Sequence, residues 1–75
     1  MKIAARAIVH LEKNQPSVEG LICKQRGRMI IAGHYIVRDA KILHSADGSH
    51  DVSSTAVEGD MHIPATRVLY VEVLG

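Results

Sequence analysis

The stretch that decides the fold is residues 59–75, GDMHIPATRVLYVEVLG. It predicts a short strand at 61–63, a one-turn break at 64–67 and a long strand at 68–74. Pro64 favours the break, because proline has a fixed φ and brings no N–H donor to a sheet. One face of the last strand is wholly apolar, and the other face carries a single glutamate. Such a strand must be covered on both sides, which a 75-residue chain can scarcely do alone. The pattern therefore predicts self-association.

The contact between copies is expected at this closing part of the chain. The unpaired backbone groups of an exposed edge strand are a template for pairing with another chain. Repeated pairing of this kind closes a ring when the rotation between neighbours allows it. We expect a homo-oligomer, most simply a ring, with the interface residues Met61, Ile63, Val68, Tyr70, Val71 and Leu74.

Composition sets the scale of the protein and excludes several classes. Residues 1–75 make one small domain, whose core must be aliphatic because the chain has no Trp or Phe and only two Tyr. The formal net charge of +1 gives no global attraction to nucleic acid or to an anionic membrane. The lone Cys23 excludes an internal disulfide, and no run is long and apolar enough for a signal peptide or a membrane helix. We expect a cytoplasmic protein with no membrane partner.

The first half of the chain reads as strands. Residues 2–11 alternate apolar and polar positions with period two, which favours a strand, while their Ala content leaves a helix as the alternative. Residues 17–25 predict a second strand, in which Gly20 indicates a bulge or a sharp bend. Gly27 within Arg26-Gly27-Arg28 predicts a tight reversal.

The middle of the chain predicts one long bent strand followed by a polar loop. Residues 29–37 are apolar at both parities, and Gly33 inside them would let this third strand curl. Residues 38–44 continue as a short strand or an extension of it. Residues 45–56 are the most polar segment and are expected to form a hairpin tip or loop. Together these strands and turns predict an all-β fold, a small, strongly bent, partly open SH3-like barrel of five to six strands.

A family resemblance adds to this reading. A bent strand followed by MHIPATRVLYVEVL resembles the closing part of Sm-like proteins, in which a short strand, a one-turn link and a last strand pair with neighbours into a ring. The wider pattern PSVEGLICKQRGR, YIVRDAKIL and GDMHIPATRVLYVEVL is similar to small proteins encoded by actinobacterial phages. The resemblance implies a ring-forming barrel, in a bacterial host cell or in a virion. The RNA-reading positions of the family depart here, because Ala40 and Lys41 follow Asp39 and no Asn is near.

Basic residues suggest an alternative function. A ring would repeat a basic cluster around one rim, where local charge could bind the phosphates of single-stranded RNA or DNA. The candidate residues are Lys24, Arg26, Arg28, Arg38 and Arg67. The simpler interpretation is a solvated hairpin tip, since the aromatic platforms of single-strand binders are almost missing.

Catalysis and metal binding have little support in the sequence. The histidines 10, 34, 44, 50 and 62 do not follow the short fixed spacings of zinc sites, and Asp47 and Asp51 do not complete one. Cys23 lies within a predicted strand, where buried thiols are usually inert. The serines of the polar loop lack a nucleophile-elbow pattern. We expect no enzyme activity, no metal and no cofactor.

Overall fold

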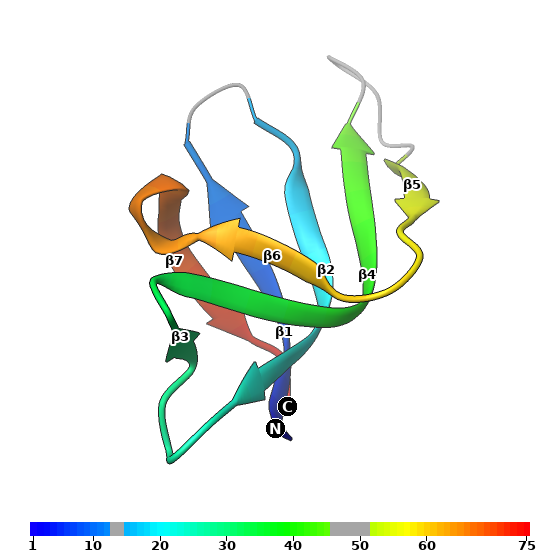
Figure 1. The fold of residues 1–75 in the computed structure, drawn as a ribbon. Coiled ribbons are helices and arrows are strands. Elements are labelled where there is room, and N and C mark those ends of the chain that lie inside the picture. Colours follow the sequence, from blue (N-terminus) through cyan, green and yellow to red (C-terminus); the bar gives the residue numbers. More distant parts are fainter. Residues whose placement is uncertain (13–14, 46–51) are drawn as a thin grey trace.

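The computed structural model describes residues 1–12, 15–45 and 52–75, and within them the chain forms seven strands and one turn of 3-10 helix (Figure 1). The elements are β1 (Lys2–Leu11), β2 (Ser17–Lys24), β3 (Ile30–Ile31), β4 (His34–Ser45), β5 (Val52–Ala56), β6 (Met61–Pro64), η1 (Ala65–Arg67) and β7 (Val68–Val73). The predicted all-β class is confirmed, as is the order of strand, one-turn break and strand that Pro64 indicated. The helical alternative for residues 2–11 is wrong.

Strand β4 is the centre of the sheet because both of its edges are paired. Tyr35 near its start lies between Ile30 of β3 and Ile63 of β6, while Ile42 further along lies between β2 and β5. Strand β2 also pairs with β1, and β1 pairs in turn with β7, and all of these pairings are antiparallel. Figure 1 shows β4 curving across the molecule, so that its first half lies with β6 and its second half with β5. The curled sheet forms a small, partly open β-barrel.

The sharp bend that closes this barrel lies where β2 meets β4. Asp39 in β4 has a φ of 53°, and the β2–β4 register shifts between Glu19 and Leu21. A Cβ on Gly20 would lie 2.5 Å from Val37 Cγ1 and 2.9 Å from the carbonyl oxygen of Arg38. Only glycine lets the two backbones approach this closely. The irregularity predicted at Gly20 is confirmed.

The predicted third strand over residues 29–37 is wrong, because the chain reverses inside it. Ala32 and Gly33 have φ values of 51° and 79° and connect β3 to β4, pairing Ile31 with His34. Positive φ at both central residues is the geometry of a type I′ hairpin turn. Gly33 therefore makes a turn and not a curl. The reversal predicted at Gly27 is confirmed, with Arg26 and Gly27 at φ 54° and 76°.

Replacing Ala32 by asparagine should stabilise the protein. Alanine pays a steric cost at positive φ, whereas asparagine tolerates this conformation and Asn-Gly is the preferred type I′ pair. We expect the free energy of unfolding to rise by about 0.5–1 kcal/mol, measured by urea denaturation. Ala32→Val is the matched control, since a β-branched residue at this φ should lower it. Equal midpoints for the two variants would contradict the assigned turn.

The core is aliphatic, as the composition predicts. Its fully buried residues come from the four strands β1, β2, β4 and β6 and are Ala7, Val9, Val18, Ile22, Val37, Ala40 and Ile63. The loop expected over residues 45–56 is wrong for the part that the structure describes, because Ser45 ends β4 and Val52–Ala56 form β5, which pairs with β4. Residues 46–51 lie outside the described residues. Across residues 1–12, 15–45 and 52–75, no helix has the length and apolar character needed to cross a membrane.

Candidate functional site

The free edge of β7 is the first feature with functional meaning. In the described part of the chain β7 pairs only with β1, at the end of the strand order. The N–H of Leu74 donates to the carbonyl of Arg6 at 2.8 Å. Because residues of an antiparallel strand alternate in direction, Val71 and Val73 then point their N–H and C=O groups away from β1. These two residues present unpaired backbone groups along an open edge.

Large apolar side chains accompany this edge. Leu69 and Tyr70 are 64% and 57% exposed, and Val73 and Leu74 are 58% and 45% exposed. Of these four, the sequence analysis named Tyr70 and Leu74. Leu69 and Val73 were not predicted from the sequence. For Leu69 the reason is the shift of the β1–β7 register between His10 and Leu11, which interrupts the alternation of faces there.

The other expected interface residues lie deeper. Val68, Val71 and Met61 are half-buried against the core. Ile63 is only 3% exposed and belongs to the core itself, so its side chain has no surface to offer another copy. The inward direction of Ile63 follows from its pairing with Tyr35 in the curled first half of β4, which the sequence analysis treated as part of another strand.

A polar cluster fixes β7 to β1 on the outer face of the sheet. The rings of His10 and Tyr70 stack with centroids 4.3 Å apart. His10 Nε2 lies 3.0 Å from Glu72 Oε1, and the Ser17 hydroxyl lies 3.3 Å from His10 Nδ1. These contacts link β2, β1 and β7. They hold β7 in place on β1, although the edge of β7 opposite β1 is open.

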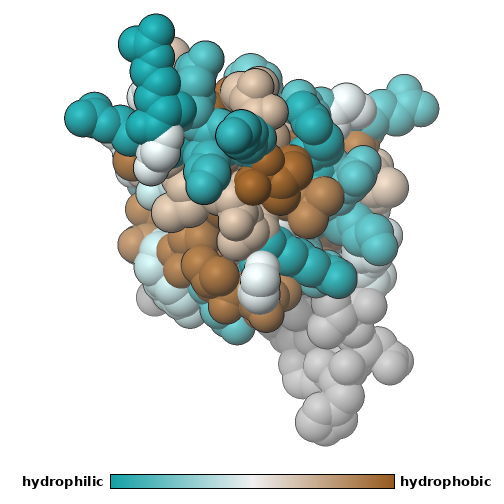
Figure 2. Space-filling model, turned by 90° about the horizontal axis from the view of Figure 1, so that it is seen from below, coloured by the Kyte–Doolittle hydropathy of each residue, from teal (hydrophilic) through white to brown (hydrophobic). Residues whose placement is uncertain are grey.

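One end of the barrel combines apolar and basic surface. Figure 2 shows apolar area gathered on the face seen from below, bordered by hydrophilic side chains. Both chain ends and β3 lie at this end in Figure 1. The exposed apolar residues of the chain ends and of the segment around β3 are Met1, Ile3, Met29, Ile30, Val73 and Leu74.

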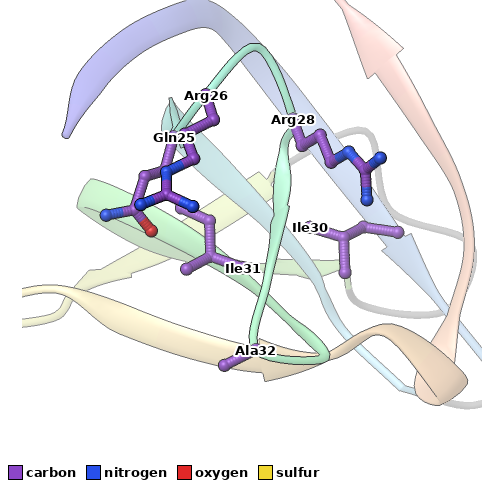
Figure 3. A pocket seen from close by; sticks show the side chains of 6 residues that line it. All are labelled: Gln25, Arg26, Arg28, Ile30, Ile31 and Ala32. Atoms are coloured by element: carbon purple, nitrogen blue, oxygen red, sulfur yellow. The ribbon is translucent and has the colours of Figure 1, made fainter.

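The end of β2 and the connection from β2 to β3 carry three of the five predicted basic residues, Lys24, Arg26 and Arg28. An open hollow of about 480 Å³ lies between the two arms of this connection, with Arg26 on one arm and Arg28 on the other (Figure 3). A second hollow of about 400 Å³ adds Lys2 and Lys24, which face each other in the β1–β2 ladder. The residues that line these two hollows include no carboxylate. We name Lys2, Lys24, Arg26 and Arg28 the basic hairpin.

The remaining predicted basic residues lie apart from it. Arg38 Nε is 3.4 Å from Asp60 Oδ1, so its charge is already paired. Arg67 ends η1 and lines a different hollow, together with His62. The structure thus groups three of the five predicted residues and adds Lys2. The antiparallel pairing of residues 2–11 with residues 17–25 would have revealed Lys2.

A salt bridge links β1 and β2 on the outer surface. Arg6 donates to Glu19 at 2.6 Å, and this hydrogen bond, opposed by desolvation and aided by the charges of Arg6 and Lys41, lowers the pKa of the Glu19 carboxyl. A lowered folded-state pKa contributes stability above the unfolded pKa that is lost as the pH falls through the folded pKa.

Arg6→Gln should therefore raise the pKa of Glu19 and remove this acid-dependent contribution to stability. The Glu19 carboxyl can be titrated by NMR in both proteins. Arg67→Gln, which removes the same charge beside a different hollow, is the matched control. An unchanged Glu19 titration would contradict the assigned cause.

Within the described residues, potential metal ligands do not form a cluster. The ring centroids of His34 and His62 are 6.5 Å apart. Within residues 1–12, 15–45 and 52–75, no three His, Cys, Asp or Glu side chains lie together as potential ligands. The candidates His50, Asp47 and Asp51 lie outside the described residues. Cys23 is buried as a free thiol.

Comparison with known proteins finds no matching family model, no matching curated protein and no matching solved structure. The Sm-like and phage resemblances therefore stay predictions. The features of the structure that bear on function are the open edge of β7 and the basic hairpin.

Proposed function

We propose that this protein is a non-enzymatic, self-assembling small β-barrel with a structural or accessory role. Further copies associate with it through the free edge of β7. The observation that supports this proposal most directly is the open backbone edge at Val71 and Val73, accompanied by exposed apolar side chains. The resemblance to phage proteins suggests a virus-encoded accessory or virion component.

Residues 71–73 of the β7 edge lack the features that usually prevent pairing with another chain. Soluble proteins blunt exposed edges with lysine, proline, bulges or a covering loop. The outer part of β7, residues 71–73, has no lysine or proline and carries Glu72 as its one charge. Burying each large apolar side chain contributes about 1.5–3 kcal/mol. Four such side chains beside an open edge offset much of the entropy lost on association.

Hydrogen exchange tests this proposal at the residues that carry it. If copies pair along β7, the amides of Val71 and Val73 should become protected as the protein concentration rises. The amide of Leu74 is already bonded to Arg6 and provides the internal control. Exchange rates at Val71 and Val73 that stay fast at every concentration would contradict assembly through this edge.

A second candidate function is supported by the basic hairpin. We propose that it binds the phosphates of single-stranded RNA or DNA, because its cations lie together around two hollows without a lining carboxylate. Arginine and lysine bind phosphate through charge-assisted hydrogen bonds. The isoleucines of β3 add apolar surface beside Arg26 and Arg28.

Reversing two charges of the basic hairpin should abolish this binding. The variant is Arg26→Glu with Arg28→Glu, and fluorescence polarisation with a labelled single strand is the measurement. We expect a loss of affinity of at least tenfold at low salt, and a shallower dependence on salt for whatever binding is left. Arg67→Glu, which lies outside the basic hairpin, is the matched control. No binding by the unmodified chain at low salt would eliminate this candidate.

A further inference from the structure

We propose that assembly takes the form of a two-fold dimer, in which β7 pairs antiparallel with β7 of a second copy about Val71. This inference rests on the proposed function, because it assumes that β7 is the assembly edge. It adds the identity of the facing edge and the register. A ring would instead require β7 to pair with a different edge of its neighbour.

The other free edges are poor partners for β7. The Ala65 N–H donates to the Gly33 carbonyl at 2.9 Å. Because backbone groups alternate in direction along an antiparallel strand, the N–H and C=O groups of Ile63 and Met61 then point toward β4. The backbone groups of His62 and Pro64 point away from β4, and proline has no N–H to donate. The free edge of β6 therefore has only one backbone donor within its four residues.

The edges of β3 and β5 offer less still. Strand β3 contains only two residues. In β5 the described side chains, Ser53 to Ala56, are small or polar and exposed, so pairing there would bury little apolar area. Unlike the described edges of β3, β5 and β6, β7 combines two outward donors with large exposed apolar side chains. The best match for the β7 edge is therefore the same edge of another copy.

Charge selects the register of this pairing. Centring the two-fold axis on Glu72 would place two glutamates directly opposite each other, an arrangement that destabilises a strand pair. Centring it on Val71 places Tyr70 opposite Glu72 of the second copy, and brings Leu69 across from Val73. Val71 then faces itself as a hydrogen-bonded pair, using the groups that β1 leaves free.

Two side chains on the outer face of β7 are already held in position for this register in the single copy. His10 stacks on Tyr70 and contacts Glu72, so both side chains are already held before a second copy arrives. Side chains that are fixed in advance lose less entropy on binding. The same His10 contacts link β7 to β1.

Disulfide trapping tests the dimer and its register together. In a hydrogen-bonded antiparallel pair the Cα atoms are about 5.5 Å apart, which suits a disulfide. Val71→Cys in a Cys23→Ala background should therefore give mostly covalent dimer under mild oxidation. Glu72→Cys in the same background is the matched control and should link several-fold less, because residue 72 faces residue 70.

Each outcome has one meaning. Efficient linkage at residue 72 but not at residue 71 would overturn the register. A larger oligomer of the unmodified chain without linkage at residue 71 would overturn the two-fold dimer while leaving self-association intact. A monomeric unmodified chain would overturn both. If Cys23→Ala prevents folding, the same comparison is made with Cys23 retained, since that thiol is buried, and the linked peptides are identified by mass spectrometry.

Discussion

Replacing Gly20 by alanine is expected to lower the free energy of unfolding by about 2–3 kcal/mol. The added Cβ would meet Val37 Cγ1 at 2.5 Å, the Arg38 carbonyl at 2.9 Å and the Ala40 Cα at 3.2 Å. Two of these atoms are backbone, so relief requires β2 and β4 to separate at the bend. A domain of this size has a total stability of about 4–11 kcal/mol, of which this loss is a large part.

Gly75→Ala is the matched control, because a Cβ there meets nothing within 4 Å. Urea denaturation followed by circular dichroism gives the midpoint of each variant. If Gly20→Ala and Gly75→Ala unfold at the same midpoint, then the close crossing of β2 and β4 is not a feature of the folded protein.

Replacing Tyr70 by glutamate is expected to convert the assembled protein to a monomer that keeps its fold. Tyr70 is 57% exposed, so a charge there is tolerated in the single copy. In the assembled edge it would lie opposite Glu72 of the next copy, and like charges in such a position weaken association by about a hundredfold. Light scattering measures the mass, and circular dichroism verifies the fold.

Thr55→Glu supplies the control for this experiment. It adds the same charge at an exposed position of β5, away from the proposed edge. Its mass should equal that of the unmodified chain. If Tyr70→Glu assembles as well as Thr55→Glu does, β7 is not the contact.

The open edge of β7 is a consequence of how the barrel is connected. Both edges of β4 are occupied, by β3 and β2 on one side and by β6 and β5 on the other. The chain turns through η1 after β6, and within the residues that the structure describes β7 pairs with β1 alone. The bend at Gly20 and Asp39 makes this arrangement possible, because it lets one strand serve both halves of the sheet.

The order of strand, break and strand in residues 59–75 was predictable because a proline separates two apolar segments. Pro64 cannot continue a central strand, and the apolar run after Arg67 has the composition of a strand. The hairpin at Ala32 and Gly33 was not predictable in the same way. The residues on both sides of the turn are apolar at odd and even positions alike, and alanine is unusual at positive φ. Residues 29–37 therefore have the pattern of one strand.

The candidate site was predictable in part, for a related reason. The exposure of Tyr70 follows from simple alternation, but the exposure of Leu69 beside it does not. A register shift in the β1–β7 pairing changes which residues face outward, and nothing local in the sequence marks that shift. The burial of Ile63 depends on its partner Tyr35, which is 28 positions earlier in the chain and belongs to β4.

The mass of the unmodified chain in solution tests the central claim most directly. Sedimentation equilibrium over a range of concentrations should give a particle of twice the 8.2 kDa chain mass that dissociates on dilution. A particle that stays at 8.2 kDa up to the highest concentration would contradict assembly through β7.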